Sequence, residues 1–441
     1  MNYRECLDYL ARIQSLGIKF GLDNVRAVLG ELDDPQKEFK SIQIAGSNGK
    51  GSVCAMVTRI LTLHKIKCGL FTSPHLIDIE ERIRIGADLI SRKEFCRLLT
   101  FLQQKIQDMK DRGVLKTPPT YFELMTLLAV LYFKESRVDM AVLEVGMGGR
   151  FDATSAVDPV VTAITTISGE HQEYLGDSLS QIAFEKAGII KPGVPVVSGV
   201  IDEDAKRVIQ ERAQELGAPF FDVFGKNTSF VKKRTKDRYI FVYVLNGKVY
   251  RYSTRLPGCH QGKNAAVAIG IADQIHQRCR KLDKEKIIDG IESTKWEGRL
   301  EIVSRKPLIM LDGAHNIEGA GALREYLDEF TGSVSVLVFA VMKGKKIKEI
   351  SDILFPKADR VIITRFQFYR AASTEEILSE TLRHKHRITC EPDPVQALRS
   401  AVHSAGRNGS ILIAGSLYIV GEMKKALRES GILSGSIKKR R

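Results

Sequence analysis

The chain has 441 residues, too many for a single hydrophobic core, and its composition of 44% hydrophobic and 27% charged residues excludes a disordered or fibrous protein. No apolar run reaches the roughly 20 residues that cross a bilayer, and the charged N-terminus is unlike a secretory signal, so we expect a cytoplasmic protein with no membrane partner. The seven scattered cysteines form no CxxC pair, so we expect reduced thiols. The net charge of +14 suits binding of nucleic acid or of an anionic small molecule. The densest basic clusters, 232–236 and 438–441, however lack the interleaved aromatic residues that stack on bases. Solvated charge is therefore the favoured interpretation of these clusters, and nucleic-acid binding is the weaker alternative.

Short apolar runs alternate with helical patterns from residue 41 to about residue 200. Strands are predicted over residues 41–45, 68–71, 140–145, 160–166 and 194–198. Helices are predicted over residues 52–64, 92–111, 122–135 and 178–189. Such alternation predicts a mostly parallel sheet with helices on both faces.

The pattern changes after residue 222. Three short strands are predicted over 229–233, 239–245 and 248–253, with Asn246-Gly247 as a strong hairpin signal, and a helix over 262–279. A second alternation then begins near residue 300, with strands over 308–311, 334–340, 360–364 and 410–414 and helices around 317–329, 345–354, 373–383 and 394–405. A larger α/β domain with a small β hairpin region is therefore expected to precede a smaller α/β domain, with ligands at the carboxyl ends of the strands between them.

The sharpest motif is AGSNGKGS, residues 45–52, directly after a predicted strand and before a predicted helix. Glycines allow successive backbone N–H groups to surround phosphate oxygens, and a helix N-terminus adds partial positive charge. Lys50 supplies a charge for the β- and γ-phosphates, and the Ser52 hydroxyl is a ligand for Mg²⁺. A plain connecting turn is the alternative, but a lysine among three glycines has little structural use there. The motif predicts a P-loop-type mononucleotide-binding domain.

Three polar residues are predicted at the same edge of this sheet. Glu144 ends an apolar strand, His171 follows the next strand, and Ser73 follows the strand after the phosphate-loop helix. A carboxylate and a hydroxyl at the carboxyl ends of strands suit Mg²⁺. The alternatives are a surface carboxylate, an ordinary hydrogen-bonded histidine and a Ser-Pro turn.

Two further groups carry charge in places where structure alone does not require it. Lys186 lies beside Glu185 on an otherwise apolar helix, where an exposed charge pair is the favoured interpretation from the residues alone. Asp312 and His315 lie where another strand ends and a helix begins. Asp312 is therefore a candidate acceptor for ribose hydroxyls, and His315 is a candidate for a position close to phosphate. A helix cap by Asn316 is the simpler alternative.

Taken together, the motifs resemble those of the folylpolyglutamate synthase / dihydrofolate synthase family, within the Mur ligase superfamily, over nearly the whole chain. The matching stretches are GSNGKGS (46–52), TSPHL (72–76), ERIRI (81–85), TYFE (120–123), EVGMGGRFDAT (144–154), LGDSLSQIAFEKAGIIKPG (175–193), LPGCHQGKNAA (256–266), WEGRLE (296–301) and LDGAHN (311–316). Departures occur at Ser47, Ser155, Glu170 and Ile317, where the family more often has Thr, Asn, Asp and Pro.

The resemblance implies an ATP-binding domain over 1–296 and a Rossmann-like ligase domain over 297–441, with ATP and two Mg²⁺ ions between them. It implies a monomer that adds L-glutamate to dihydropteroate, to reduced folate (poly)glutamates, or to both, through an acyl phosphate. ATP would contact Asn48, Gly49, Lys50, Gly51, Ser52, Asn264, Arg299 and Asp312. Pteroate would contact Leu22, Asp23, Thr120, Tyr121, Phe122, Glu123, Phe151, Asp152 and Ala153. Metal would be held by Ser52, Ser73, Glu144, His171 and a carbamylated Lys186, with Lys50, Lys186 and His315 as the catalytic residues.

Two other functions stay open. A Mur-type ligase acting on another carboxylate usually has an extra N-terminal domain for a UDP group, for which a phosphate loop at residue 46 is expected to leave no room. A nucleotide-dependent binding protein without ligation is disfavoured by the presence of Lys186, Glu144 and His171.

Overall fold

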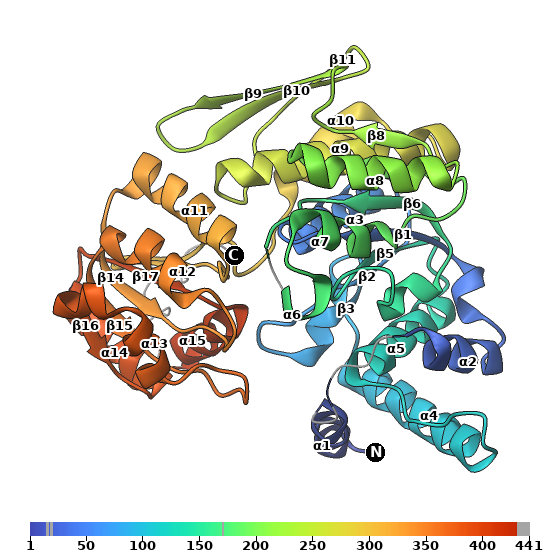
Figure 1. Cartoon of the computed structure of the whole chain (residues 1–441), viewed down its shortest axis with the longest axis horizontal. Coiled ribbons are helices and arrows are strands. Elements are labelled where there is room, and N and C mark those ends of the chain that lie inside the picture. The colour runs from blue at the N-terminus through green and yellow to red at the C-terminus, as the bar shows by residue number, and fades with distance from the viewer. Residues whose placement is uncertain (15–16, 18–20, 170–171, 430–441) are drawn as a thin grey trace.

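The computed structural model describes residues 1–14, 17, 21–169 and 172–429. Figure 1 shows two α/β bodies side by side: an N-terminal body in blue to yellow, and a C-terminal body in orange to red. Among the described residues, no helix is both long and apolar enough to span a membrane. His171, predicted as a metal ligand, and the basic cluster 438–441 lie outside the described residues.

The sheet of the N-terminal body has the strand order β4-β3-β2-β5-β1-β6-β7-β8 within the described part of the chain. Its strands are β1 (Lys40–Ala45), β2 (Cys68–Phe71), β3 (Ile83–Ile85), β4 (Asp88–Leu89), β5 (Met140–Glu144), β6 (Pro159–Ile164), β7 (Val196–Ser198) and β8 (Phe220–Asp222). From β2 to β8 across the sheet all neighbours are parallel, while β3 and β4 pair antiparallel at one edge. The predicted mostly parallel sheet is confirmed.

Helices cover both faces of this sheet. They are α1 (Tyr3–Gln14), α2 (Asp23–Glu31), α3 (Lys50–Leu63), α4 (Arg92–Asp111), α5 (Tyr121–Glu135), α6 (Gln172–Leu175), α7 (Leu179–Ala187), α8 (Glu203–Glu215), α9 (Cys259–Arg278) and α10 (Lys284–Ser293). Shorter helical turns are η1 (Pro35–Glu38), η2 (Ile79–Arg82) and η3 (Ala153–Ala156).

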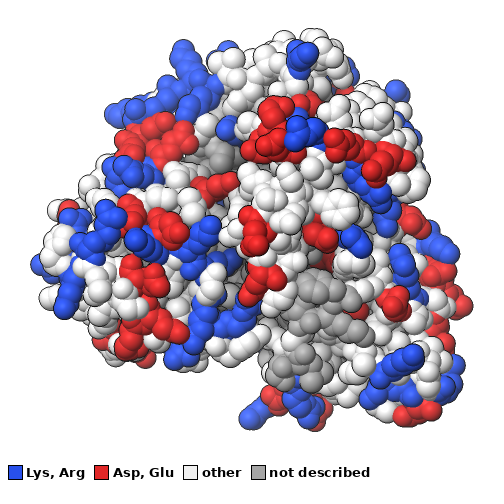
Figure 2. Space-filling model, in the orientation of Figure 1, with Lys and Arg blue, Asp and Glu red and all other residues white. Residues whose placement is uncertain are grey.

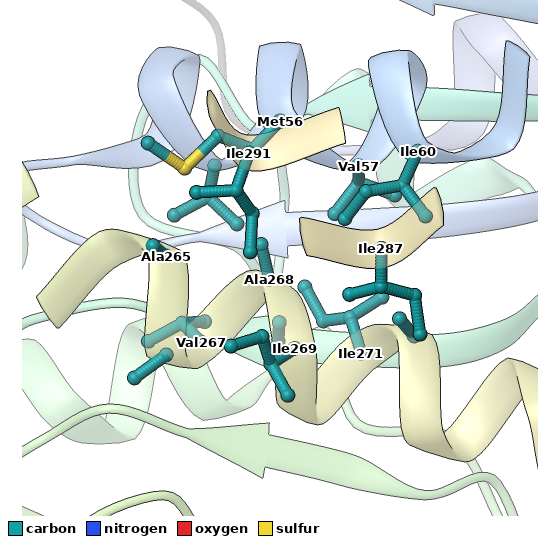
Figure 3. Packing of buried hydrophobic residues seen from close by; sticks show 14 of the residues in the cluster. Met56, Val57, Ile60, Ala265, Val267, Ala268, Ile269, Ile271, Ile287 and Ile291 are labelled. Carbon is teal, nitrogen blue, oxygen red and sulfur yellow. The ribbon is translucent and has the colours of Figure 1, made fainter. Parts of the chain in front are cut away.

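The core beneath the phosphate-loop helix is formed by α3, α9 and α10. Met56, Val57 and Ile60 of α3 lie against Ile287 and Ile291 of α10 and the apolar face of α9 (Figure 3). At Gly290 of α10, an added Cβ would lie 2.6 Å from the Ile60 side chain, so only glycine permits this approach. The packing fixes α3, and with it the loop at its N-terminus.

A separate antiparallel sheet has the order β11-β10-β9, with β9 (Thr228–Arg234), β10 (Tyr239–Leu245) and β11 (Lys248–Tyr252). Asn246 and Gly247 have φ angles of 50° and 76°, as the predicted two-residue hairpin requires. Alternate residues of β10 are buried, and Phe241 lies so close to α9 that a Cβ on Gly262 would be 2.3 Å from its ring. The sheet is therefore attached to α9.

The C-terminal body has the strand order β12-β13-β17-β14-β15-β16. Its strands are β12 (Glu301–Arg305), β13 (Leu308–Leu311), β14 (Val334–Phe339), β15 (Ala358–Ile363), β16 (Ile388–Cys390) and β17 (Ser410–Ala414). Only β12 pairs antiparallel among these described strands. The helices are α11 (Ile317–Tyr326), η4 (Leu327–Thr331, a π-helix), α12 (Ile347–Leu354), η5 (Phe355–Lys357), α13 (Thr374–Glu380), η6 (Leu382–Arg387), α14 (Pro394–Ala405) and α15 (Leu417–Glu429). The expected smaller α/β unit is confirmed.

The basic cluster 232–236 is more than solvated charge, which corrects the sequence interpretation. Lys232 Nζ lies 2.7 Å from Glu325 Oε1 of α11, and Arg234 donates to the Glu329 carbonyl. The Tyr239 hydroxyl also donates to Glu329, with its ring 5.0 Å from that of Phe330. The small sheet thus connects the two bodies at the top of Figure 1.

Candidate active site

The phosphate loop lies where β1 ends and α3 begins, and two of its glycines are required by their surroundings. Gly46 and Gly49 have φ angles of 144° and 88°. A Cβ on Gly46 would lie 2.0 Å from Thr165 Oγ1, and one on Gly49 would lie 2.4 Å from Asn264 Oδ1. The loop is therefore held closely between β6 and α9, and the predicted nucleotide residue Asn264 is at its surface.

Two threonines after β6 hold the loop in shape. Asn48 N donates to Thr166 Oγ1 at 2.9 Å, and Thr165 Oγ1 donates to Asn48 O at 2.6 Å. Ser47 N donates to Thr166 O at 2.8 Å. Sequence reasoning missed Thr165 and Thr166; their place directly after an apolar strand, at the edge that carries the loop, was the available signal.

Lys50 is the first residue of α3, and its side chain folds back over the loop. Nζ donates to Gly46 O at 2.7 Å and to Ser47 O at 3.1 Å. These carbonyl contacts hold the ammonium group beside the loop without neutralising it. The positive charge therefore lies where the motif predicts it.

Glu144 ends β5, and its carboxylate is buried, with 5% of the residue exposed. Burial raises its pKa above 4.5, while the positive charge of Lys50 and a hydrogen bond from Ser73 N, 3.0 Å from Oε2, act in the opposite direction. A Cβ on Gly51 would be 3.6 Å from Oε1, so the carboxylate is beside the first turn of α3, which contains the buried Ser52. The structure thus brings Ser73, Glu144 and the Ser52 segment to one place.

These groups fit a divalent cation that takes most of its ligands from phosphate and water. The donors are hard oxygens, and a cation beside the buried Glu144 would favour its charged form. Among the described residues, no three His, Cys, Asp or Glu side chains gather as a metal site. One carboxylate and serine hydroxyls suit Mg²⁺, which keeps several waters and binds substrate phosphates.

Lys186 is buried, with only 2% of its surface exposed, so the interpretation as an exposed charge pair is wrong. Its Nζ donates to Gly46 O at 3.0 Å, the carbonyl that also accepts a hydrogen bond from Lys50 Nζ. Glu185 turns away, with Oε1 3.7 Å from Arg150 Nη1. Helical periodicity shows α7 to be apolar but does not show that the loop packs over this position.

The C-terminal body approaches the loop through the segment 312–318. Asp312 Oδ2 and Oδ1 accept from Leu300 N and Ala314 N, each at 2.8 Å, and burial raises the Asp312 pKa above 3.8. This carboxylate orders the connection between the bodies, next to the Arg299 guanidinium. His315 Nδ1 lies 2.8 Å from Gly313 O at the same opening of α11.

Asn316 has two contacts. Its Oδ1 accepts from Gly319 N at 2.8 Å, which confirms the helix cap. Its Nδ2 donates to Asn48 Oδ1 at 3.0 Å, across the boundary between the bodies.

The three segments predicted for pteroate lie together. The helix α2, which begins at Asp23 after Leu22, contacts both α5 and η3. Thr120 and Glu123 form a capping box for α5, and a Cβ on Gly146 would be 2.6 Å from the Phe122 ring. These contacts place the three segments at one wall of the N-terminal body.

Asp152 has a structural role within this wall. Its Oδ2 accepts from Gly146 N at 2.9 Å and from Met147 N at 3.0 Å, and its Oδ1 accepts from Thr154 N at 3.0 Å. The carboxylate therefore orders the loop from β5 to η3. The Phe151 ring is on the exposed side, 4.5 Å from the Arg150 guanidinium.

A pocket between the two bodies is lined by residues of the phosphate-loop helix, of the Ser73 segment and of the hinge, together with Glu144. Its lining comprises Gly51, Thr72, Ser73, Pro74, Leu76, Glu81, Arg84, Glu144, Trp296, Glu297, Arg299 and Leu417. Sequence reasoning missed Trp296 and Arg84. The Trp296 Nε1 is 3.0 Å from the position of a Cβ on Gly51, and Arg84 lies 5.3 Å from the Trp296 ring. A lone tryptophan between two predicted domains was the available signal.

Two family models match the chain: the Mur ligase middle domain over residues 44–272 and the dihydrofolate synthetase C-terminal domain over residues 297–428. The dihydrofolate synthase/folylpolyglutamate synthase of Bacillus subtilis is 32% identical over 432 residues, covering 97% of this chain and 99% of that protein.

Two solved structures with bound ligands are also similar. One is Escherichia coli FolC in complex with DHPP and ADP, 26% identical with a TM-score of 0.82, covering 96% of this chain and 98% of that one. The other is the bifunctional folylpolyglutamate synthase/dihydrofolate synthase of Yersinia pestis with AMPPNP and Mn ion, 29% identical with a TM-score of 0.82, covering 97% and 98%. With its phosphate loop, buried carboxylate and interdomain pocket, the chain belongs to the folylpolyglutamate synthase/dihydrofolate synthase family of ATP-dependent glutamate ligases.

Proposed function

We propose that the chain adds L-glutamate both to dihydropteroate and to reduced folates that already carry glutamate, and releases ADP and phosphate. The observation that carries this proposal is the pocket between the bodies, where the phosphate loop, Glu144 and the segment 299–316 meet. The full-length likeness to a relative named for both activities supports both acceptors. The proposed boundary between an ATP-binding domain, 1–296, and a ligase domain, 297–441, falls in the hinge next to Trp296.

ATP is proposed to bind with its phosphates on residues 48–52. The positive φ of Gly49 and the α3 N-terminus favour anion binding there, and Lys50 provides the charge. Asn264 and Arg299 flank the loop and the hinge, and are proposed to contact the rest of the nucleotide together with Asp312. Asp312 retains acceptor capacity, because a carboxylate has about four lone-pair sites and backbone N–H groups use two.

Mg²⁺ is proposed at Ser52, Ser73 and Glu144, with His171 and a carbamylated Lys186 as the further protein ligands. When bound, the cation neutralises phosphate charge during transfer. Carbamylation of Lys186 would replace a buried ammonium group by a carboxylate-like one beside Gly46.

The reaction is proposed to proceed in two displacements. A carboxylate oxygen of the acceptor attacks the γ-phosphorus, the bond to ADP breaks, and an acyl phosphate forms. The α-amine of glutamate, after losing a proton, attacks the acyl carbon, and phosphate leaves with the oxygen that attacked. Lys50 stabilises negative charge on the transferring group. His315 is proposed to position phosphate or glutamate.

The function is tested by incubating the purified protein with ATP, Mg²⁺, glutamate and one acceptor at a time. Mass spectrometry should find dihydropteroate and tetrahydrofolate each gaining glutamate residues, with one ADP released per addition. ATP hydrolysis that does not depend on either acceptor, with no mass-shifted product, would contradict the proposal. A Lys50→Ala variant is the control for contaminating ligase.

A further inference from the structure

Two neighbouring loops of the C-terminal body carry five cations and no acidic residue. They are residues 340–346, after β14, and residues 364–373, after β15; the cations are Lys343, Lys345, Lys346, Arg365 and Arg370. Both loops start at the carboxyl ends of parallel strands, and so lie at the same edge as Asp312, which follows β13. Ligands of open α/β sheets bind at this edge. Lysine and arginine side chains also border the C-terminal body in the surface view of Figure 2.

The two loops hold each other in place. Lys343 N donates to Arg370 O at 2.8 Å, and Ala372 N donates to Val341 O at 3.0 Å. Met342 and Ala371 form a β-bridge. The backbones of Lys343 and Arg370 are therefore adjacent and ordered, as a binding surface requires.

The second loop also reaches the N-terminal body. Arg370 Nη2 lies 4.0 Å from Glu173 Oε1 of α6. The Tyr418 ring stacks on that of Phe368, with centroids 4.6 Å apart, and the neighbouring Tyr369 is 64% exposed. Burial raises the pKa of Tyr418. The positive charges of Arg82, from the N-terminal body, and of Arg370 act in the opposite direction, so both guanidinium groups lie near the Tyr418 side chain.

Arg82 connects this loop with the wall of the N-terminal body that is formed by the segments predicted for pteroate. Its guanidinium lies 5.3 Å from the Tyr121 ring, in the segment 120–123. Arg82 is thus near both the Tyr121 ring and Tyr418, and the glutamate end of a folate on that wall would extend past Tyr418 to meet the cations of the C-terminal body.

The acidic neighbours of these cations are exposed partners that a ligand can replace. Lys343 Nζ is 3.2 Å from Glu376 Oε1, with about half of each side chain exposed (54% and 48%). Exposed pairs of this kind contribute little to stability, so exchange for a ligand carboxylate costs little.

We propose that Lys343, Arg365 and Arg370 form a binding tract for the carboxylates of the γ-linked glutamate chain on the acceptor. This inference rests on the proposed function. Each γ-linked glutamate keeps a free α-carboxylate, so the negative charge of the acceptor grows with chain length and complements a row of cations. Dihydropteroate has no glutamate and does not use the tract. The tract therefore acts on chain elongation and not on the first addition.

The test compares acceptors with zero, one, three and five glutamates, using the full chain. Arg370→Gln and Lys343→Gln, singly and together, should leave kcat and KM for dihydropteroate unchanged. They should raise KM for the tri- and pentaglutamates by about 3- to 5-fold per charge, the range expected for partly exposed pairs, with less effect at high salt. The matched control is Lys233→Gln, which removes one exposed charge from β9, a strand that contributes none of the pocket-lining residues.

Three outcomes would overturn the tract. An equal change for every acceptor, including dihydropteroate, would indicate a general effect on the site. A change in KM for free glutamate alone would assign the cations to the incoming amino acid. An equal effect in Lys233→Gln would indicate net charge only. A wild-type protein that forms no product with any acceptor would contradict the proposed function instead of the tract. In that case calorimetry with the pentaglutamate tests the tract independently, because the double variant should bind the pentaglutamate more weakly than the wild type does.

Discussion

The side-chain amide of Asn316 donates a 3.0 Å hydrogen bond to Asn48 Oδ1, and so joins the first turn of α11 to the phosphate loop. Asn48 Nδ2 extends the contact to Glu318 Oε2 at 3.1 Å. Asn48 therefore belongs to the proposed phosphate loop and also contacts the C-terminal body. If ATP binds on this loop as proposed, phosphate binding and the position of the second body are connected at this residue.

This connection predicts that Asn48 and Asn316 act together. Asn316→Ser keeps a helix-capping oxygen but loses the donor to Asn48, and Asn48→Ala removes the acceptor. In a double-mutant cycle on kcat/KM for ATP, the two changes should be non-additive by about 1 kcal/mol, roughly 5-fold. Independent, multiplicative effects would show that the bond does not connect the bodies.

Lys50→Ala should lower kcat for ATP-dependent ligation by about 100- to 1,000-fold, the cost typical of losing one stabilising group at a transferring charge. The fold should not change, because the hydrogen bonds that Nζ donates go to the Gly46 and Ser47 carbonyls of its own loop. Thermal unfolding checks this, and Lys116→Ala, at an exposed position, is the control. Unchanged turnover would remove the phosphate loop from the chemistry.

Much of the fold was predictable because long, buried elements leave clear patterns. The apolar, β-branched run at β1 predicts that strand nearly to its observed ends, and the helical periodicity at α4 does the same for that helix. The strands β3, β4, β8 and β16 were missed, since two or three residues cannot show an alternation. The five-residue strand β12 was also missed, because only one of its residues is buried and it lacks an apolar run.

The site divides in the same way. Lys50 and Glu144 were predicted because their chemistry is unusual for a strand end or a glycine turn. Thr165 and Thr166 were missed, since threonines after an apolar strand also continue a strand pattern. The burial of Lys186 depends on the loop packed over α7, a contact 140 residues apart in sequence that periodicity along one helix does not record.

Glu144→Gln should make the ligand-free protein more stable at neutral pH and remove stabilisation by Mg²⁺. The folded pKa of Glu144 lies above its ordinary 4.5, so its contribution to stability is full below pH 4.5 and is lost as pH rises through the folded value. The melting temperature of the variant minus that of the wild type should therefore grow from pH 4 to pH 7. A difference that stays constant or reverses over this range would contradict the burial argument.

Lys186 should carry a carbamate in the active enzyme. The protein exchanged into ¹³C-bicarbonate should show a carbamate carbon signal in NMR spectra that is absent in Lys186→Arg, and this variant should lose activity at least 100-fold, because it keeps a cation where an anion is required. A fully active enzyme with an unmodified Lys186 amine would contradict this prediction.

Oxygen transfer during turnover tests most directly that the acceptor carboxylate is activated by the γ-phosphate held on the loop 46–52. Dihydropteroate labelled with ¹⁸O in both carboxylate oxygens is converted with unlabelled ATP, and the released phosphate is analysed by mass spectrometry. Each phosphate should carry one ¹⁸O atom, and the new amide should retain the other. Phosphate without label, formed together with the glutamylated product, would show that the carboxylate is joined by another route.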